Sequence, residues 1–281
     1  MTALPPILHG LREIAAQYDA LVCDVWGVVH NGAHAHLESC DALRHFRKYH
    51  GPVALLTNAP RPLSDLLTQF GRLGVPEDCY DEIVTSGMAT RADLERRADT
   101  GKLSMFHLGP ERDRGIFDGL PIICTAPAHA ALVLCTGLFD DETEVPDDYK
   151  PLLAEFKARS LPFVCANPDI VVQRGGKLVY CAGAVAAVYE SLGGKVTYYG
   201  KPHRPIYDLT LASLKGVNKP LAIGDGLQTD VKGANGAGLD ALFIADGIHG
   251  EEIEPFTPEH LRSLFDRAGV HALASMRTLV W

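Results

Sequence analysis

Long apolar runs are absent from this sequence. No stretch approaches the ~20 consecutive apolar residues that a membrane-spanning helix needs. The first residues also lack the basic segment followed by an apolar segment that is typical of a secretory signal. The sequence therefore indicates neither a membrane protein nor an exported one, and we expect a cytoplasmic location.

Positive charge is also scarce. The chain carries 26 Lys and Arg against 35 Asp and Glu, for a formal net charge of -9. Broad contact with nucleic acid or with an anionic membrane needs a basic face, so we expect neither partner. Any phosphate site must then be local, built from backbone N–H groups, a metal ion and one or two cationic side chains.

Paired cysteines are a third absence. The seven cysteines form no C-x-x-C pair, and their number is odd. Cys23, Cys135 and Cys165 stand in apolar runs that are typical of strands. We interpret them as small buried hydrophobic residues in a reducing compartment, rather than as disulfides or metal ligands.

What the sequence does contain is a long alternation of strand and helix patterns. A chain of 281 residues with 47% hydrophobic residues can bury one large or two modest cores. After an expected lead-in helix at 8–19, the pattern predicts a parallel doubly wound α/β sheet. Its first half comprises strands at 20–26, 52–58 and 82–85 and helices at 36–50, 63–72 and 87–98.

The pattern changes in the middle of the chain. Short strand candidates and turn-rich loops fill residues 102–181, with one clear helix at 147–159 and a hairpin turn at Gln173-Arg174-Gly175-Gly176-Lys177. We therefore predict that 87–193 is an inserted second domain, and that 1–86 and 194–281 form the core domain. The α/β alternation then resumes, with strands at 196–199, 220–225 and 241–245 and helices at 205–215 and 229–236.

Polar side chains follow four of the predicted core strands. The carboxyl ends of parallel strands meet at one edge of a sheet, which is where α/β proteins place their ligands. These residues should therefore converge. They are Asp24, the pair Thr57 and Asn58, Lys201, and the pair Asp225 and Asp230.

Phosphoryl transfer is the chemistry that uses this set. The Asp24 carboxylate can attack phosphorus and form an aspartyl phosphate. Because a carboxylate and a phosphate repel each other, Mg²⁺ is expected between them, held by Asp24, Asp225 and one backbone carbonyl. Thr57 and Asn58 can donate hydrogen bonds to phosphate oxygens, and Lys201 adds a compact positive charge.

In their residue types, order and spacing, these strand-end residues and their neighbours resemble the four motifs of the haloacid dehalogenase (HAD) superfamily. More narrowly, the chain is similar to the class IIA, NagD / 4-nitrophenylphosphatase-like subfamily, which carries its cap domain where the insertion lies here. The resemblance covers nearly the whole chain. The motifs are Asp24-x-x-Gly27-Val28, Leu55-Leu56-Thr57-Asn58, Gly200-Lys201-Pro202, Gly224-Asp225-x-x-x-Thr229-Asp230 and, in the cap, Asn167-Pro168-Asp169.

The resemblance implies a Rossmann-like core with an inserted C2-type α/β cap, Mg²⁺ dependence and a small phosphorylated substrate. It implies that Asp24 is the nucleophile and that Thr57 and Lys201 hold the phosphate. It further implies that the metal is bound by Asp24, by the backbone carbonyl of Trp26 and by Asp225, with Asp230 in support. Relatives often pair through the cap, so a homodimer is expected.

Trp26 is the one departure from the family pattern. Phosphatases of the family place an Asp at this position, as acid to the leaving group and then as base to water. An indole N–H does not ionise near neutral pH, and general acid–base help is worth about 10²–10⁴ in rate. We therefore expect slow turnover of alkyl phosphates and a smaller penalty for aryl and acyl phosphates.

Several further residues have both a functional and a purely structural interpretation. His30, in the loop after the first motif, could reach the leaving group or substrate, or it could be a loop histidine exposed to solvent. His34 and His36 could bind a transition metal, although no third ligand is identifiable. Asn167 and Asp169 are the best cap candidates for contacting substrate, against a structural turn at Asn-Pro-Asp.

Two functions from different classes remain open at this point. The first is a Mg²⁺-dependent phosphatase or phosphotransferase, which the intact Asp24, Lys201 and Asp225 favour. The second is a catalytically weak phosphate-binding or regulatory pseudo-enzyme, which Trp26 favours. A phospho-accepting receiver domain is disfavoured because the acceptor here is on the first strand and a large domain is inserted. A dehalogenase would not need Asp225.

Overall fold

The computed structural model describes residues 4–99, 101–174, 177–247 and 253–281. It divides into two compact units. Unit 1 comprises Met1–Thr57, Leu67–Val84 and Lys201–Trp281, and unit 2 comprises Asn58–Leu66 and Thr85–Gly200. Unit 2 thus spans the predicted insertion, 87–193, and adds a short segment after the second core strand and residues 194–200. The strand predicted at 196–199 as part of the core sheet is therefore wrong in its place, because it pairs with β7 (Phe163–Cys165) in the sheet of unit 2. The assignment of the two units as core and cap domains stays a prediction.

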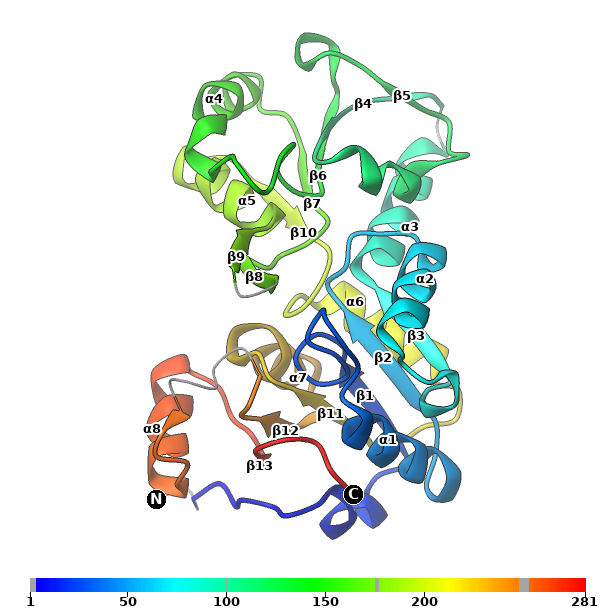
Figure 1. Cartoon of the computed structure of the whole chain (residues 1–281). Helices are drawn as coiled ribbons and strands as arrows, with labels where there is room; N and C mark the ends of the chain where they lie inside the picture. Colours follow the sequence, from blue (N-terminus) through cyan, green and yellow to red (C-terminus); the bar gives the residue numbers. More distant parts are fainter. Residues whose placement is uncertain (1–3, 100, 175–176, 248–252) are drawn as a thin grey trace. The chain divides into compact units, whose positions relative to one another are not determined.

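Unit 1 is built on a six-stranded sheet in the order β13-β12-β11-β1-β2-β3 (Figure 1). The pairings of β1 with β2 and β11, and of β12 with β11 and β13, are all parallel. The strands are β1 (Ala20–Asp24), β2 (Val53–Thr57), β3 (Glu82–Thr85), β11 (Pro220–Gly224), β12 (Asp240–Ile244) and β13 (Ala274–Met276).

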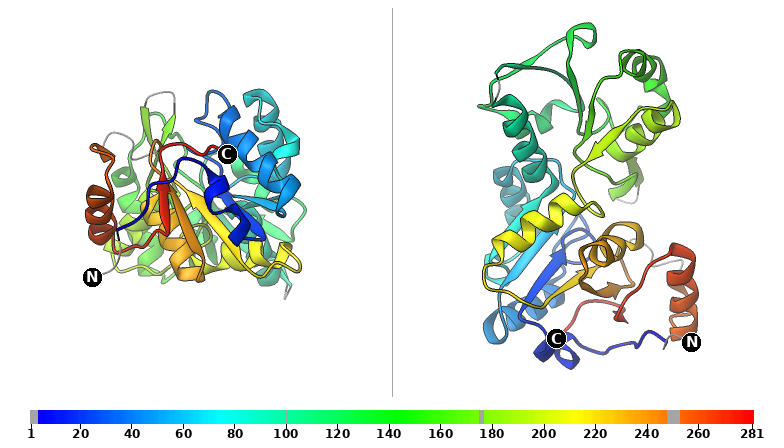
Figure 2. Two further views of the ribbon diagram at one scale, coloured as in Figure 1. Left: turned by 90° about the horizontal axis from the view of Figure 1, so that it is seen from below. Right: turned by 180° about the vertical axis from the view of Figure 1, so that it is seen from behind.

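Helices cover both faces of this sheet. Helix α1 lies in front of it in Figure 1, whereas α6 lies in front of it in the view from behind in Figure 2. This doubly wound arrangement, with its parallel sheet, confirms the predicted fold class. The helices of the chain are α1 (Leu37–Tyr49), α2 (Leu63–Leu73), α3 (Ser86–Ala98), α4 (Lys150–Ala158), α5 (Ala182–Ser191), α6 (Arg204–Ser213), α7 (Lys232–Ala237) and α8 (Pro258–Ala268).

The predicted lead-in helix at 8–19 is wrong. The structure has two short 3₁₀ turns there, Leu11–Glu13 and Ala15–Gln17. The reason is that the backbone bonds elsewhere: the Leu8 N–H donates to the Ser275 carbonyl at 2.9 Å and the Leu11 N–H to the Val280 carbonyl at 2.8 Å. Carbonyl groups of the C-terminal segment thus accept hydrogen bonds from N–H groups that a continuous helix would bond internally.

Unit 2 contains a second parallel sheet, in the order β10-β7-β6-β4-β5, and an antiparallel hairpin, β8–β9. Its core includes the stacked rings of Phe163 and Tyr189, whose centroids are 4.8 Å apart. The hairpin predicted at 173–177 is confirmed by the antiparallel pairing of its two strands, in which Arg174 is level with Lys177, while Gly175 and Gly176 lie outside the described residues. The strands are β4 (Leu103–Leu108), β5 (Ile122–Cys124), β6 (Leu132–Cys135), β7 (Phe163–Cys165), β8 (Val171–Arg174), β9 (Lys177–Tyr180) and β10 (Val196–Tyr198).

Strand register in unit 1 brings the motif residues to one edge. Asp24, the last residue of β1, is level with Leu56 of β2, so Thr57 comes one residue later. On the other side, Cys23 is level with Ile223 of β11, so Asp225 follows one residue beyond the level of Asp24. Three neighbouring strands therefore end in polar residues at the same height.

Within the described residues, no helix is both long and apolar enough to cross a membrane.

Candidate active site

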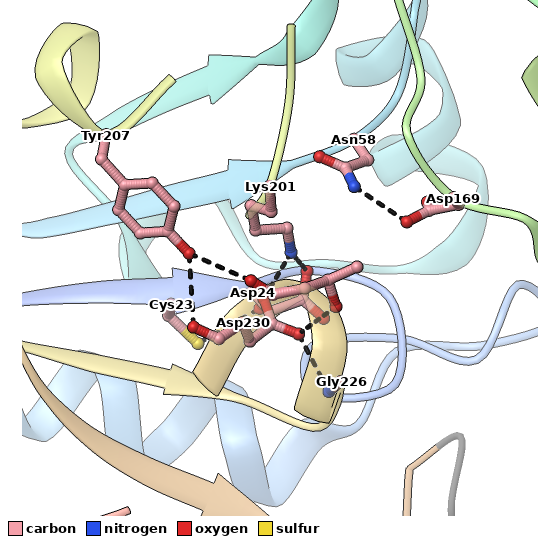
Figure 3. A network of polar contacts seen from close by, with 9 residues as sticks. Cys23, Asp24, Asn58, Asp169, Lys201, Tyr207, Gly226 and Asp230 are labelled. Atoms are coloured by element: carbon pink, nitrogen blue, oxygen red, sulfur yellow. Dashed lines mark hydrogen bonds and ion pairs between the residues drawn. The ribbon is translucent and has the colours of Figure 1, made fainter. Parts of the chain in front are cut away.

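A buried lysine joins two carboxylates at the carboxyl edge of the unit 1 sheet. The Lys201 ammonium points between Asp24 and Asp230 (Figure 3), forming an ion pair with Asp24 Oδ1 and another with Asp230 Oδ1, the latter at 2.6 Å. The three residues are only 6%, 3% and 7% exposed in the order Asp24, Lys201, Asp230. Because the charges are shielded from water, each acts strongly on the others.

Asp230 is fixed by backbone and hydroxyl donors. Its Oδ2 accepts a hydrogen bond from the Gly226 N–H at 2.9 Å and one from the Thr229 hydroxyl at 3.3 Å. The Tyr207 hydroxyl donates to the Asp230 backbone carbonyl at 3.3 Å. Asp230 stands in a single π-helical turn, Leu227–Val231, that precedes α7, in place of the start of the helix predicted at 229–236. Such turns are often found at functional sites.

Asp225 occupies a space that two glycines leave open. A Cβ on Gly27 would lie 2.1 Å from Asp225 Oδ2, and one on Gly247 would lie 2.0 Å from the same oxygen. Gly27 also has a φ of +91°, which side chains other than glycine rarely adopt. Any larger residue at either position would displace the carboxylate.

Burial and neighbouring charges shift the proton equilibria of the nucleophile candidate and its lysine. Burial, reinforced by the charge of Asp230, raises the pKa of Asp24 well above its usual range, and the Lys201 ammonium opposes this rise. Burial lowers the pKa of Lys201, but the charges of Asp230 and Asp24 more than offset it, so the net shift is upward. The lysine therefore stays charged.

The same residues fit a divalent cation. Asp24, Asp225 and Asp230 each offer an oxygen, and these atoms lie within 4.8 Å of one another. Three carboxylates against one ammonium leave two negative charges in a buried space when all are ionised, and a divalent cation would balance them. An all-oxygen donor set suits Mg²⁺. This is the only such cluster of three His, Cys, Asp or Glu side chains among the described residues, so the His34 and His36 alternative gains no third ligand.

Trp26 and His30 form a packed pair in the loop after β1. Their rings meet edge to face with centroids 5.1 Å apart, and His30 also contacts Phe70 at 5.9 Å. His30 Nδ1 accepts a hydrogen bond from the Gly32 N–H at 3.1 Å. A Cβ on Gly32 would lie 2.6 Å from Trp26 Cη2, so the glycine makes room for the indole.

His30 is poorly suited to replace the missing acid. His30 is only 1% exposed. Burial lowers the pKa of its imidazole to about 4, with a further contribution from His36. At neutral pH the imidazole is uncharged and accepts a hydrogen bond through Nδ1. The contact of His30 with substrate that the sequence suggested stays a prediction, as does the metal-binding role of the Trp26 carbonyl.

Two predicted substrate residues are tied to one another in unit 2. The Asn58 side-chain amide donates to Asp169 Oδ1 at 2.8 Å, also drawn in Figure 3. Asn167 Oδ1 accepts from the Asp169 N–H at 3.0 Å, which closes a turn at Asn-Pro-Asp. The structural interpretation of this turn is therefore supported. The phosphate role of Asn58 and the substrate roles of Asn167 and Asp169 stay predictions, as does the phosphate role of buried Thr57 at the end of β2.

Comparison with known proteins identifies the family. A solved hydrolase of the haloacid dehalogenase-like family from Brucella suis is 42% identical, matches 97% of this chain and 100% of that chain, and superposes with a TM-score of 0.86. The chain belongs to the haloacid dehalogenase-like hydrolases. Family models described as haloacid dehalogenase-like hydrolase and HAD-hydrolase-like match residues 21–121 and 198–266.

Two further relatives place the chain within the family. Ribonucleotide monophosphatase NagD from Escherichia coli is 27% identical over 85% of this chain and 93% of that protein. A 4-nitrophenylphosphatase structure from Thermotoga maritima, 21% identical over 94% of this chain and 96% of its own, shares the fold with a TM-score of 0.72. The predicted resemblance to the class IIA, NagD-like subfamily is confirmed.

Several residues that shape this site have no clear signal in the sequence. Tyr207, which steadies Asp230, lies in an ordinary helical segment with no local signal of its role. Gly247 stands far along the chain from Asp225 and has no motif spacing to connect them. Gly27 belonged to the first motif, but only its φ and its distance from Asp225 show why the position needs glycine.

Proposed function

We propose that this protein is a Mg²⁺-dependent phosphatase or phosphotransferase that acts on a small phosphorylated metabolite through an aspartyl phosphate at Asp24. The observation that carries the proposal is the buried cluster of Asp24, Lys201, Asp225 and Asp230 at the carboxyl edge of the unit 1 sheet. Family membership supports it, because named relatives are phosphatases.

The residues divide the proposed reaction between them. An Asp24 oxygen forms a bond to phosphorus as the bond from phosphorus to the leaving oxygen breaks, and that oxygen departs with the electron pair. Water then attacks the phosphorus, releasing phosphate and the Asp24 carboxylate. Lys201 and Thr57 donate to the phosphate oxygens as negative charge develops on them.

Bound Mg²⁺, held by Asp24, Asp225 and the Trp26 carbonyl with Asp230 in support, would supply charge neutralisation between the carboxylate and the phosphate. Asp230 has a second duty, because it anchors the Lys201 ammonium beside Asp24. Removal of Asp230 should therefore weaken both metal binding and lysine position.

Trp26 defines which substrates we expect. Its indole cannot hand a proton to a poor alkoxide leaving group, and the neutral, buried His30 beside it does not replace that function. Aryl and acyl phosphates release stable anions and need little protonation. The protein should therefore hydrolyse aryl or acyl phosphates in clear preference to alkyl phosphates.

The test compares Mg²⁺-dependent hydrolysis of 4-nitrophenyl phosphate and glycerol phosphate by wild type, Asp24→Asn, Trp26→Asp and Trp26→Phe. We expect activity on the aryl ester in wild type, a loss of at least ~10³-fold in Asp24→Asn, and a selective gain of ~10-fold or more on the alkyl ester in Trp26→Asp. Trp26→Phe is the matched control and should show no gain.

A second candidate function is a regulatory phosphate binder without useful turnover. The packing of Trp26 against His30 favours the binder, because the side chain at this position makes an aromatic contact where phosphatases of the family would have an acid. Equal inactivity of wild type and Asp24→Asn across aryl, alkyl and acyl phosphates, with phosphate binding retained, would establish the binder and refute the enzyme.

A further inference from the structure

Unit 2 has a cavity of its own at the carboxyl edge of its parallel sheet. Its volume is about 390 Å³, within the usual range for small-molecule sites. The walls come from the ends of β4 and β5, from the 3₁₀ turn Glu111–Phe117 and from the loop after β6. The side chains that matter here are Phe106, His107, Arg114, Thr125 and Phe139.

Topology favours a ligand at this place. In the order β10-β7-β6-β4-β5, the chain passes from β4 to β5 on one side and then to β6 on the other. The direction of strand addition thus reverses at β4. Open α/β sheets bind ligands outside the carboxyl ends of their strands at such a reversal.

One wall of the cavity is fixed by a buried polar chain. His107 Nε2 and Thr136 Oγ1 are 2.9 Å apart, and Thr136 in turn hydrogen-bonds Asp113. Asp113 Oδ1 lies 3.5 Å from Arg61 Nε. Gly109, with a φ of +155°, allows this arrangement, because a Cβ there would lie 2.0 Å from Thr136 Oγ1.

The charged side chains of the cavity are one cation, Arg114, and one carboxylate, Glu111, among the described lining residues. Burial, with a smaller contribution from Arg114, lowers the pKa of His107 to about 4, so its ring is neutral at physiological pH. Arg114 is therefore the one positively charged side chain among the described lining residues. It lies over the Phe117 ring, 5.8 Å from the centroid, and its pairing with the exposed Glu111 at 3.3 Å is a surface contact that a ligand can replace.

The remaining lining offers two aromatic rings. Thr125 also stands in the wall, but its hydroxyl oxygen is closed off from solvent and does not face the cavity. Phe106 and Phe139 meet edge to face with centroids 6.4 Å apart. A flat aromatic ring is the shape such a pair accepts best.

We propose that this cavity binds a flat aromatic monocarboxylate. The carboxylate pairs with Arg114 in place of Glu111, and the ring packs against Phe106 and Phe139. A single negative charge is favoured over two, because Arg114 is the only cation among the described lining residues and Glu111 stands beside it. The site does not involve Asp24 and does not rest on the proposed reaction.

The test titrates 4-hydroxybenzoate and indole-3-acetate into the full chain by isothermal calorimetry, with 4-hydroxybenzyl alcohol as the uncharged comparison. We expect at least one acid to bind with a Kd of about 1 mM or tighter, and the alcohol to bind ~10-fold more weakly. Arg114→Gln should lower the affinity ~10-fold, and Arg114→Lys should lower it less.

Arg112→Gln is the matched control. Arg112 lies in the same 3₁₀ turn but pairs with Asp141 and does not line the cavity, so its loss should leave the affinity unchanged. Arg114 is 43% exposed, and its loss should not affect folding, which circular dichroism checks. The proposal is overturned if neither acid binds at 10-fold above the expected Kd, or if Arg114→Gln and Arg112→Gln behave alike.

Discussion

The carboxyl edges of the two parallel sheets carry different side chains. Unit 1 gathers Asp24, Asp225 and Asp230, two of them paired with one lysine, whereas unit 2 places a neutral histidine and the hydroxyl of Thr136 beside a cavity. Both use glycine to let polar atoms approach: Gly27 at the Asp225 carboxylate and Gly109 at the Thr136 hydroxyl. Strand order sets where polar groups converge at the edge of a sheet. The side chains at that edge then set whether it suits a cation or an organic molecule.

The charge balance is the sharper difference. The unit 1 edge is short of positive charge, and a cation would balance it. The unit 2 edge keeps His107 uncharged and has Arg114 and Glu111 as its charged lining residues among those described. Three changes should break or sharpen this contrast, the first having the largest effect.

Lys201→Met should have the largest effect on unit 1. It leaves Asp24 and Asp230 buried and close without their shared ammonium, which should cost about 3–5 kcal/mol of unfolding free energy without Mg²⁺ and less with it. Urea unfolding followed by tryptophan fluorescence measures this in unit 1 alone, since Trp26 and Trp281 are the chain's two tryptophans.

Lys232→Met is the control for Lys201→Met, because Lys232 is exposed on α7 and, among the described residues, its ammonium bonds only the Gln228 side chain at 3.1 Å. It should change stability by less than ~0.5 kcal/mol. An equal, small effect of both variants would mean that the buried ion pairs do not stabilise unit 1.

Gly27→Ala should weaken Mg²⁺ binding by ~10-fold or more, because the added methyl group would occupy the place of Asp225 Oδ2. Gly238→Ala is the matched control. Gly238 has a similar positive φ of +77°, but its Cβ would meet nothing within 4 Å. It should show the same kind of backbone strain without loss of metal affinity in calorimetry. Unchanged Mg²⁺ binding in Gly27→Ala would contradict the assignment of Asp225 as a ligand.

Asp113→Asn should change the pH dependence of unit 2. Burial raises the pKa of Asp113 to about 6, with Arg61 and Arg112 opposing the rise and Asp141 adding to it. The folded state therefore binds this proton more tightly than the unfolded state does. The resulting stabilisation is present below pH ~4 and is lost as the pH rises through about 6, for a change of about 2–3 kcal/mol.

The measurement is hydrogen exchange of the β6 amides at matched pH values, because no tryptophan reports on unit 2. Relative to wild type, Asp113→Asn should gain stability as the pH rises from 4 to 7. His107→Gln is the contrasting variant: the lowered pKa of His107 makes wild type less stable as the pH falls below about 6.5, so its removal should help at low pH. Parallel pH profiles in all three proteins would refute both assignments.

The sequence alone determined the parts that depend on local pattern and spacing. Apolar runs marked the strands, and polar residues after them marked Asp24, Asp225 and Asp230 for one edge of a sheet. Lys201 was marked in the same way, although the strand before it belongs to the sheet of unit 2. The structure brings these four together in unit 1. Departure from the family motif at Trp26 was equally visible in the sequence, because it is a matter of residue type at a fixed spacing.

Only the tertiary structure decided the rest, because the partners are far apart in the chain. Residues 8–19 have helical spacing, yet the C-terminal segment takes their hydrogen bonds. Tyr207 contacts Asp230 and Gly247 makes room for Asp225, but no motif spacing connects these pairs in the sequence. The cavity of unit 2 depends on Arg114, Thr125 and Phe139, which come from three separate segments. Local pattern predicts where a strand ends, but which side chains then share a buried space is set by strand order and packing.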